Sequence, residues 1–599
     1  MNLLFLDLET FSSTDLKNAG VYRYTEDPTF EILMCAWTRD RVNYHIAVGE
    51  QEILQIPGLF TDTIVAHNAA FERICLSTLE GVRYHDPKRY VDTMAIAAAN
   101  GLPKSLDALA KALGVEAKDS AGTRLINTFS KPNRGKRIMP SDKPDAWEEF
   151  KDYCVQDVKV LVQCYEAMDD RRTPTEKTLF LVDQAINDRG IPVDIRLAQL
   201  AVAQADVNTV RQREEFTLLT GVDNPGSVQQ VLKWFEEDGY PLPDMTKETV
   251  AEHIGRTGDP IRERVLELRQ DLALAANKKY VAALNMACQD GRVRGTLGYH
   301  GAHTGRWAGR GVQLQNLPSL SFTDEDGEWD EVAEKQAITD LFEGRDVDAT
   351  TLKKLVRPMF HGPFTVADYS AIEARVLAWL AGEMWALQAF REGRDLYVET
   401  AKRLGAKYTR KHGKVAVLAL GYQGAVNSLR VMGAEGDDDE LVVLVKAWRK
   451  ANPKIVRFWY RMDDAFWEGG RVGRFVRVEV HGKDRHIVLP SGRRLIYRDV
   501  RRSKDGRLSF QDPRGFRQDT YGGRLTENVT QATARDLLAE ALILLEQAGV
   551  PVVAHVHDEV VAETEEKGKV VRLMTKNPKW ADGLPLNAEG FVTERYRKG

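Results

Sequence analysis

Residues 551–561, PVVAHVHDEVV, place two valine-rich runs on either side of a short acidic turn. Runs of β-branched residues are typical of strands, so this stretch predicts a hairpin with Asp558 at its tip. Upstream, a second apolar strand ends at Asp368, and an amphipathic helix is predicted over residues 371–380. An aspartate at a turn or strand end is usually a cap when it stands alone. The two acids therefore indicate a functional site only when they are considered together.

Together the two segments resemble motifs A and C of the family A DNA polymerases, the bacterial DNA polymerase I type, in the family's order along the chain. The resemblance spans roughly residues 175–599 and implies an α+β right hand of palm, fingers and thumb. It implies that Asp368 and Asp558 bind two divalent metal ions, with the Tyr369 carbonyl as a further ligand. Glu373 matches the glutamate that crowds the ribose 2′ position. The implied reaction is in-line attack by a primer 3′-hydroxyl on the α-phosphate of a deoxynucleoside triphosphate.

Four side chains farther along recur every four residues, which stacks them on one face of a predicted helix. Two cations beside an apolar and aromatic surface suit a triphosphate that carries a base. The pattern resembles motif B, the fingers helix of the same family. This resemblance implies that Arg410 and Lys414 bind the triphosphate, with Lys414 as proton donor to pyrophosphate, beside Leu418 and Tyr422. The departures from the family pattern are Leu418 for an aromatic ring, Ala419 for glycine, and an extra Gln423.

The resemblance extends to segments that hold a primer-template duplex. T-G-R at 304–306, L-Q-N-L-P at 314–318 and the helix before the hairpin all match family segments. Their guanidinium and amide groups can accept the degenerate hydrogen-bond pattern of the minor groove. Two lysines at the end of a predicted thumb helix are expected to contact phosphates. The implied DNA-binding residues are Arg306, Gln315, Asn316, Lys278, Lys279, Arg524, Asn528, Gln531 and His557.

A further carboxylate pair lies at the start of the chain, in LFLDLET at residues 4–10. The two-residue period of a strand sets Phe5, Asp7 and Glu9 on one face. Neighbouring carboxylates raise each other's pKa unless a cation lies between them, so the pair favours metal binding. By itself the D-x-E pattern is a weak signal, and an exposed strand edge explains it better.

With two later segments, the pair resembles the DEDD-type 3′→5′ exonucleases, tyrosine variant, over about 170 residues. The resemblance implies a ribonuclease H-like α/β fold, a mixed sheet with helices. It also implies two metals and a tyrosine that orients the attacking water. Glu72 stands where the family usually has aspartate, and Asp92 is the competing acid, although Asp92 more resembles a helix N-cap. The implied residues are Asp7, Glu9, Glu72 and Asp157 as ligands and Tyr153 as the orienting group.

The predicted organisation has five parts. Strands are expected at 3–8, 32–38 and 63–67, and helices at 176–189, 195–219 and 260–286. The expected domains are 1–172, the exonuclease; 173–300, the thumb and linker; 301–382, the start of the palm; 383–470, the fingers; and 471–599, the rest of the palm. We expect no 5′ nuclease domain, because the exonuclease pattern begins at residue 1.

Composition limits the class of protein. The 599 residues carry a formal charge of −5, five scattered cysteines and no 18-residue apolar run. We therefore expect a cytoplasmic multi-domain protein, in the host cytoplasm if a bacteriophage encodes it, with no membrane contact and no disulfides. The resemblance implies two Mg²⁺ or Mn²⁺ ions per active site. Primer-template DNA and deoxynucleoside triphosphates are the expected partners of a monomer.

Two other functions remain open. A single-subunit RNA polymerase shares the two catalytic aspartates and the fingers lysine, but Glu373 and the exonuclease pattern argue against it. The chain could also be an exonuclease or DNA-binding protein whose polymerase activity has lapsed. Retention of Asp368, Asp558, Lys414 and Arg410 argues against that reading.

Overall fold

The computed structural model describes residues 2–115, 122–273, 276–325 and 327–598. Its N-terminal part is a mixed five-stranded sheet of order β3-β2-β1-β4-β5, in which β2 is antiparallel to both of its neighbours and β3, β4 and β5 run in the same direction as the central strand β1. The predicted strands are confirmed, and β1 is longer than expected because it continues past the two acids. The bounds are β1 Leu3–Phe11, β2 Glu31–Thr38, β3 His45–Val48, β4 Thr63–Ala66 and β5 Tyr90–Asp92.

Two apolar clusters cover the two faces of this sheet. Leu4, Leu6 and Leu8 enter one, and Phe5 enters the other, as the alternation along the strand predicts. The second cluster includes the long helix α7, which packs on β1 and β2. The helices of this part are α1 Leu16–Thr25, α2 Glu50–Ile53, α3 Ala70–Leu79, α4 Thr93–Ala99, α5 Leu106–Leu113, α6 Gly122–Phe129 and α7 Pro144–Ala167.

The N-terminal part is tied to the rest of the chain through helix α8 (Pro174–Arg189). The guanidinium of Arg73, which is 1% exposed, donates to both carboxylate oxygens of Asp188 at 2.6 and 2.9 Å. The hydroxyl of Tyr22 donates to the same carboxylate at 2.7 Å. Two side chains from different elements of the sheet domain therefore converge on a single acid of α8.

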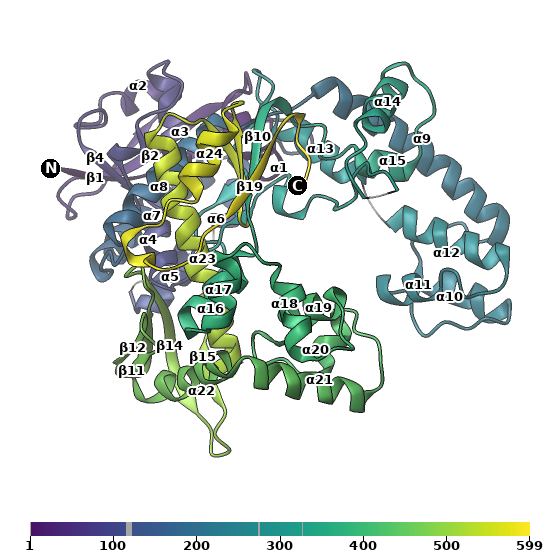
Figure 1. Ribbon diagram of the computed structural model, residues 1–599. Coiled ribbons are helices and arrows are strands. Elements are labelled where there is room, and N and C mark those ends of the chain that lie inside the picture. Colours follow the sequence, from purple (N-terminus) through teal and green to yellow (C-terminus); the bar gives the residue numbers. More distant parts are fainter. Residues whose placement is uncertain (1, 116–121, 274–275, 326, 599) are drawn as a thin grey trace.

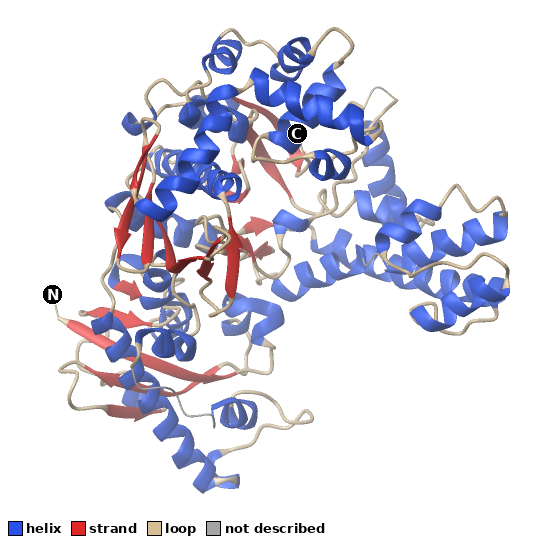
Figure 2. Ribbon diagram, turned by 90° about the horizontal axis from the view of Figure 1, so that it is seen from below, coloured by secondary structure: helices blue, strands red, loops and turns tan. Residues whose placement is uncertain are grey.

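Helices alone build an arm that projects from the body (Figures 1 and 2). Its tip has a small core of its own around Phe216, Phe235 and Val265. The predicted helix over 260–286 is helical on both sides of residues 274–275, which lie outside the described ranges. Lys278 and Lys279 were expected at the end of a helix, but α13 continues beyond them to Met286. The arm contains α9 Ile195–Thr220, α10 Val228–Glu237, α11 Lys247–His253, α12 Pro260–Ala273 and α13 Ala276–Met286.

A second sheet, antiparallel and of order β17-β18-β10-β19, forms the centre of the C-terminal part. Its strands are rich in valine, and the long buried helix α23 packs against this region with α16 and α24. The predicted hairpin over 551–561 is confirmed as β17 and β18, joined by a two-residue turn. The bounds are β10 His361–Tyr369, β17 Val552–Val556, β18 Glu559–Glu563, β19 Ala588–Arg595, α16 Ile372–Ala381, α23 Gly522–Gln547 and α24 Lys567–Met574.

Six helices and a further sheet extend from this centre (Figure 1). The first of these helices packs into the core of the centre, and the other five share a core around Leu420, Leu444 and Trp459. They are α17 Met384–Arg391, α18 Leu396–Leu404, α19 Arg410–Leu420, α20 Val426–Val431, α21 Asp438–Ala451 and α22 Pro453–Glu468. The six-stranded sheet comprises β11 Gly470–Val472, β12 Val476–His481, β13 Asp484–Val488, β14 Arg494–Arg502, β15 Leu508–Gln511 and β16 Arg517–Thr520.

The remaining segments connect these parts. Two short helices, α14 (Glu331–Phe342) and α15 (Ala349–Lys354), pack on α9. Short strand pairs join β6 (Ile191–Pro192) to β7 (Arg292–Val293) and β8 (Leu297–Gly298) to β9 (Ala308–Gly309). In the described ranges no helix is both long and apolar enough to cross a bilayer. All five cysteines are buried and free, as expected.

Candidate active sites

Two predicted acids lie next to each other on the central sheet of the C-terminal part. Asp368 on β10 pairs in register with Glu559, the first residue of β18, and the amide of Tyr369 donates to the carbonyl of Asp558 at 3.3 Å. Burial raises the pKa of Asp368 to about 6, and the charge of Asp558 contributes to this rise. Burial also raises the pKa of Asp558. Two buried carboxylates with raised pKa values form a site that a cation would stabilise.

A third acid, Glu559, was missed as a site residue. Its Oε1 accepts from the Tyr596 hydroxyl at 2.6 Å, and Arg357 donates to the same hydroxyl at 2.9 Å. Burial raises the pKa of Glu559 to about 7, and both aspartates add to the rise. The acid was visible beside Asp558 in the sequence, but its partners come from residues 357 and 596, which no local pattern connects to it.

Glu373, in the first turn of α16, is held from two sides. Its Oε1 pairs with the Arg306 guanidinium at 2.5 Å, and its Oε2 accepts from the Tyr422 hydroxyl at 3.0 Å. These partners come from the T-G-R segment and from the end of the α19 region. The arrangement fixes the carboxylate between three segments that are far apart in the sequence.

Helix α19 presents Arg410, Lys414 and Leu418 on an exposed face, as predicted. Tyr422 lies just beyond the end of the helix. The Arg410 Nε donates to Asp395 at 2.7 Å, which ties the start of α19 to the start of α18. A Cβ at Gly413 would lie 2.0 Å from the Tyr397 carbonyl oxygen, so only glycine permits this close approach of the two helices.

The extra residue Gln423 has a structural role. It adopts a left-handed backbone conformation with φ of 67°, and its Oε1 accepts from the amide of Gly523 at 2.9 Å. That amide belongs to the first turn of α23, where helix amides lack partners within the helix. Gln423 therefore caps α23 from outside, a role that its position in the sequence did not indicate.

The residues expected to contact DNA lie on several separate elements. Lys279 donates to the Val312 carbonyl at 2.7 Å, which links α13 to the residue before the 313–316 turn, and within that turn Asn316 donates to the Gln313 side chain at 2.9 Å. On α23, Asn528 donates to the Tyr497 hydroxyl at 2.9 Å. The other expected residues are placed as follows: Lys278 on α13, Gln315 in the 313–316 turn, Arg524 and Gln531 on α23, and His557 in the β17–β18 turn.

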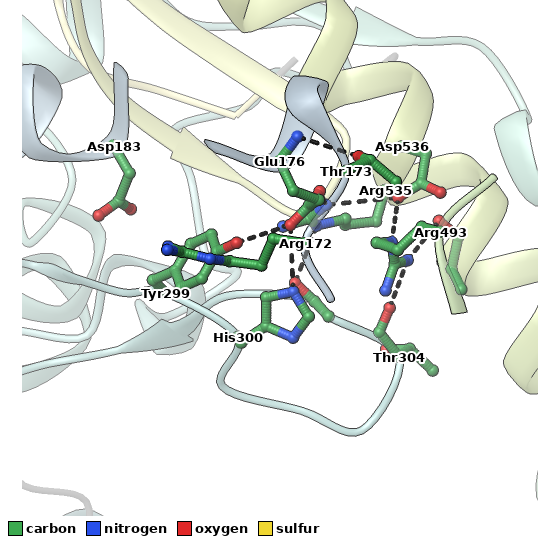
Figure 3. A network of polar contacts seen from close by, with 12 residues as sticks. Arg172, Thr173, Glu176, Asp183, Tyr299, His300, Thr304, Arg493, Arg535 and Asp536 are labelled. Carbon is green, nitrogen blue, oxygen red and sulfur yellow. Dashed lines mark hydrogen bonds and ion pairs between the residues drawn. The ribbon is translucent and has the colours of Figure 1, made fainter. Parts of the chain in front are cut away.

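The T-G-R segment is held by a buried network centred on Glu176 (Figure 3). Its Oε2 accepts from the Tyr299 hydroxyl at 2.6 Å and contacts His300 Nε2 at 3.2 Å, and its carboxylate pairs with the Arg535 guanidinium. The Arg535 Nε donates to the Gly305 carbonyl at 2.9 Å. Arg493 donates to the Thr304 carbonyl at 2.8 Å and to Asp536 at 2.7 Å. The network therefore fixes the backbone on the N-terminal side of Arg306.

We expect Glu176→Gln to destabilise the protein by about 3–5 kcal/mol, because the change leaves the buried Arg535 without its anionic partner. The pKa of Glu176 lies well below its ordinary value, since Arg535 and His300 outweigh the effect of burial. The measurement is the midpoint of urea unfolding. Glu252→Gln makes the same change in an exposed pair with Arg256 and should leave the midpoint unchanged. Equal midpoints for both variants would contradict the role of the network.

In the N-terminal part, Glu72 lies beside the acid pair of β1. Glu72 is 3% exposed, and burial together with the charges of Asp7, Asp92 and Glu9 raises its pKa well above the ordinary value. Its Oε2 is buried and has no hydrogen-bond partner within the described ranges. A buried carboxylate oxygen of this kind fits a metal-ligand role.

Helix α7 places Tyr153 and Asp157 one turn apart, and both are buried on the side that packs on the sheet. The Cys154 Sγ lies 3.7 Å from the carbonyl oxygen of Asp7, so this face of α7 covers β1 at the acid pair. The ring of Tyr153 packs on Gly122, where a Cβ would lie 2.3 Å from a ring carbon. Strand β1 and helix α7, the first strand and the last helix of the N-terminal part, therefore lie in contact at the acid pair of β1.

Asp92 is the N-cap of α4, as predicted. Its Oδ1 accepts from the amides of Met94 and Ala95 at 2.9 and 3.2 Å, and from the amide of Asn68 at 3.1 Å. Asn68 has a φ of 70°, and this left-handed conformation places its amide at the cap. One carboxylate oxygen of Asp92 therefore accepts hydrogen bonds from three backbone amides.

Comparisons with known proteins agree with this geometry. The family model "DNA polymerase family A" matches residues 205–434. The chain is 39% identical to the DNA polymerase of Bacillus phage SP02 over all of both chains. It is 24% identical to the thermostable DNA polymerase I of Thermus thermophilus, over 70% of this chain and 47% of that one.

Solved structures give the same fold. The chain superposes with a TM-score of 0.64 and 16% identity on a structure titled "POL domain of Pol1 from M. smegmatis complex with DNA primer-template and dNTP", covering 98% of this chain and 95% of that one. This likeness bears on the fold, whereas the full-length match to a phage enzyme bears on the family. The chain belongs to the family A DNA polymerases.

Proposed function

We propose that this polymerase extends a primer 3′ end along a DNA template by two-metal catalysis, and that its N-terminal part removes 3′ nucleotides as a proofreading exonuclease. The observation that carries the polymerase half is that Asp558, in the turn before β18, lies beside the end of β10 that carries Asp368, with the pKa of each acid raised. Membership of the DNA polymerase family argues against a single-subunit RNA polymerase.

The metal site of the polymerase would use Asp368, Asp558 and the Tyr369 carbonyl. Two divalent ions, Mg²⁺ or Mn²⁺, would lower the pKa of the primer hydroxyl and neutralise the pyrophosphate. Lys414 and Arg410, exposed on α19, would bind the triphosphate, and Lys414 would give a proton to the leaving pyrophosphate. Leu418 would present an aliphatic side chain to the nucleotide at the position where the family usually has an aromatic ring.

Glu373 would exclude ribonucleotides, because its carboxylate is fixed by Arg306 and Tyr422 and cannot swing away. We expect Glu373→Ala to raise the relative kcat/KM for ribonucleotides by roughly 10- to 100-fold, as the excluded volume for one hydroxyl opens. Single-nucleotide incorporation with paired ribo- and deoxynucleotides measures this ratio. Glu373→Gln keeps the bulk without the charge and should retain discrimination; a large loss there would assign selectivity to the ion pair with Arg306 instead.

The exonuclease would use Asp7, Glu9, Glu72 and Asp157 as metal ligands, with Tyr153 orienting water. The strand order and the antiparallel β2 support a ribonuclease H-like fold. We assign the third acid to Glu72 and not Asp92, because Asp92 serves backbone donors while Glu72 keeps a buried oxygen without a partner in the described ranges.

The proposed domains are 1–172 for the exonuclease, 173–300 for the thumb and linker, 301–382 and 471–599 for the palm, and 383–470 for the fingers. Primer-template DNA and deoxynucleoside triphosphates are the proposed substrates of a monomer. The solved relative that carries a primer-template and a nucleotide supports this choice.

Primer extension tests the polymerase. The full chain is incubated with a labelled primer-template, Mg²⁺ and all four deoxynucleotides, with EDTA as the matched control. Extension that requires the metal is expected, and an unextended primer would remove the proposal. Degradation of a labelled single-stranded 3′ end, with no nucleotides present, tests the exonuclease separately.

A further inference from the structure

Three side chains that can bind a metal ion lie together on the hairpin of β12 and β13. They are Glu479, His481 and His486, and one ligand atom of each lies within 4.8 Å of those of the other two. The hairpin belongs to the six-stranded sheet, and the acids proposed for catalysis belong to other sheets. Strands β12 and β10 lie well apart in Figure 1. The cluster is therefore separate from the sites described above.

The register of the hairpin places these side chains on one face. Glu479 pairs directly with His486, and His481 pairs with Asp484, on either side of a two-residue turn that begins at Gly482. Gly482 has a φ of 60°, a conformation that favours glycine in such turns. Residues two apart on a strand, and residues opposite each other on paired strands, share a face of the sheet. Backbone pairing therefore holds the three side chains together.

The spacing of the ligand atoms fits a zinc ion. The His481 Nε2 and the Glu479 Oε2 lie 3.5 Å apart. Two ligand atoms that each lie about 2.1 Å from a tetrahedral Zn²⁺ are about 3.4 Å from each other. The rings of His481 and His486 stack with their centroids 4.1 Å apart. Because the His481 side chain is 52% exposed, it can turn to direct its nitrogen at a shared ion.

His486 is the buried member of the cluster. It is 3% exposed, and its ring makes no hydrogen bond to the other residues that the structure describes. Native proteins rarely leave a buried polar side chain without a partner. A metal ion held between the two imidazoles would supply that partner.

Two arginines compete with a cation for Glu479. Arg477 contacts its Oε1 at 2.6 Å, and Arg494 contacts its Oε2 at 3.4 Å. The contact with Arg477 can persist while Oε2 binds a metal, because metal-bound carboxylates are commonly hydrogen-bonded to a further group. The contact with Arg494 is long, and this side chain is 35% exposed and can move into solvent. The oxygen that faces His481 is therefore the one available to an ion.

We propose that Glu479, His481 and His486 bind one zinc ion, with water as the fourth ligand. Two imidazoles and a carboxylate are typical zinc ligands, whereas Mg²⁺ prefers oxygen. Asp484 lies on the same face, but its carboxylate accepts from the amide of Asp499 at 3.0 Å, which leaves the fourth position to water. The ion would join β12 to β13 beside their turn. This proposal does not rest on the proposed function.

Zn²⁺ itself is the probe. The full chain is freed of metal with a chelator and dialysed against Zn²⁺ in the presence of excess Mg²⁺, and the bound zinc is measured. Since zinc can also enter carboxylate sites, variants are compared with the wild type. His481→Ala should bind one zinc ion fewer per chain. His361→Ala, which removes an exposed histidine at the start of β10, should bind as much as the wild type.

Co²⁺ in place of zinc distinguishes this site from the proposed catalytic sites. A four-coordinate Co²⁺ with two imidazoles absorbs strongly in the visible, whereas a six-coordinate Co²⁺ with oxygen ligands absorbs weakly. We expect a strong band in the wild type and in Asp558→Asn, and its loss in His481→Ala. His486→Ala should weaken Zn²⁺ binding by more than roughly 100-fold, since it removes a direct ligand.

Either of two results would overturn the proposal. The first is equal zinc content in the wild type and in His481→Ala. The second is a visible Co²⁺ band that is missing from the wild type or unchanged in that variant. The exposed position of His481 makes its loss harmless to folding, so His481→Ala decides the matter even if His486→Ala unfolds.

Discussion

Asp558→Asn is expected to slow primer extension by roughly a thousandfold, the effect of losing about 4 kcal/mol of charge stabilisation in the transition state. The change keeps the size of the side chain and removes the negative charge that lies close to Asp368. Because Asp558 lies in a two-residue turn whose backbone hydrogen bond to Tyr369 uses the carbonyl and not the side chain, the sheet should persist. Single-turnover extension with saturating nucleotide is the measurement.

The matched control is Asp505→Asn, the same substitution in the turn of another hairpin, between β14 and β15. It should extend primers at the wild-type rate. The 3′ degradation activity of Asp558→Asn serves as an internal control and should be unchanged. Residual extension within tenfold of the wild type would show that Asp558 does not hold a catalytic metal.

Asp7→Ala is expected to reduce degradation of single-stranded 3′ ends by a similar factor, roughly a thousandfold, and to leave extension unaffected. Asp7 lies on the central strand beneath α7, where Glu9 and Glu72 also converge. Removing one of these acids lowers the negative charge that would attract the metals. Release of the labelled 3′ nucleotide, followed in the absence of deoxynucleotides, gives the rate.

Two further substitutions separate the acids that compete for the third ligand position. Glu72→Gln should lose 3′ degradation without a lower melting temperature, since it neutralises a buried acid whose pKa is already raised. Asp92→Asn should instead lower the melting temperature, because it weakens the cap of α4. The reverse pattern would move the metal ligand to Asp92.

Local patterns predicted the strands, the hairpin and the faces on which acids lie. The alternation in β1 and the valine runs around Asp558 decided these elements without help from distant residues. The site partners could not be predicted in this way. Arg306 meets Glu373 across a separation of 67 residues, and Glu176 meets Arg535 across 359. Periodicity contains no information on such pairings, which only the folded chain creates.

Two lysines of α13 show the same limit in a helix. The pattern placed Lys278 and Lys279 at the end of a helix, whereas α13 continues beyond them to Met286. The inserted Gln423 is a further case. Only the position of Gly523 reveals what its side chain caps.

The convergence of Arg73 and Tyr22 on Asp188 limits exchange of the N-terminal part between polymerases. A fragment cut near residue 172 would leave that aspartate facing solvent, and the detached N-terminal fragment would present an unneutralised guanidinium from its interior. Grafting this N-terminal segment onto another polymerase would therefore require an acid at the equivalent point of the recipient helix. The N-terminal part is thus fitted to its own scaffold and is not a separable module.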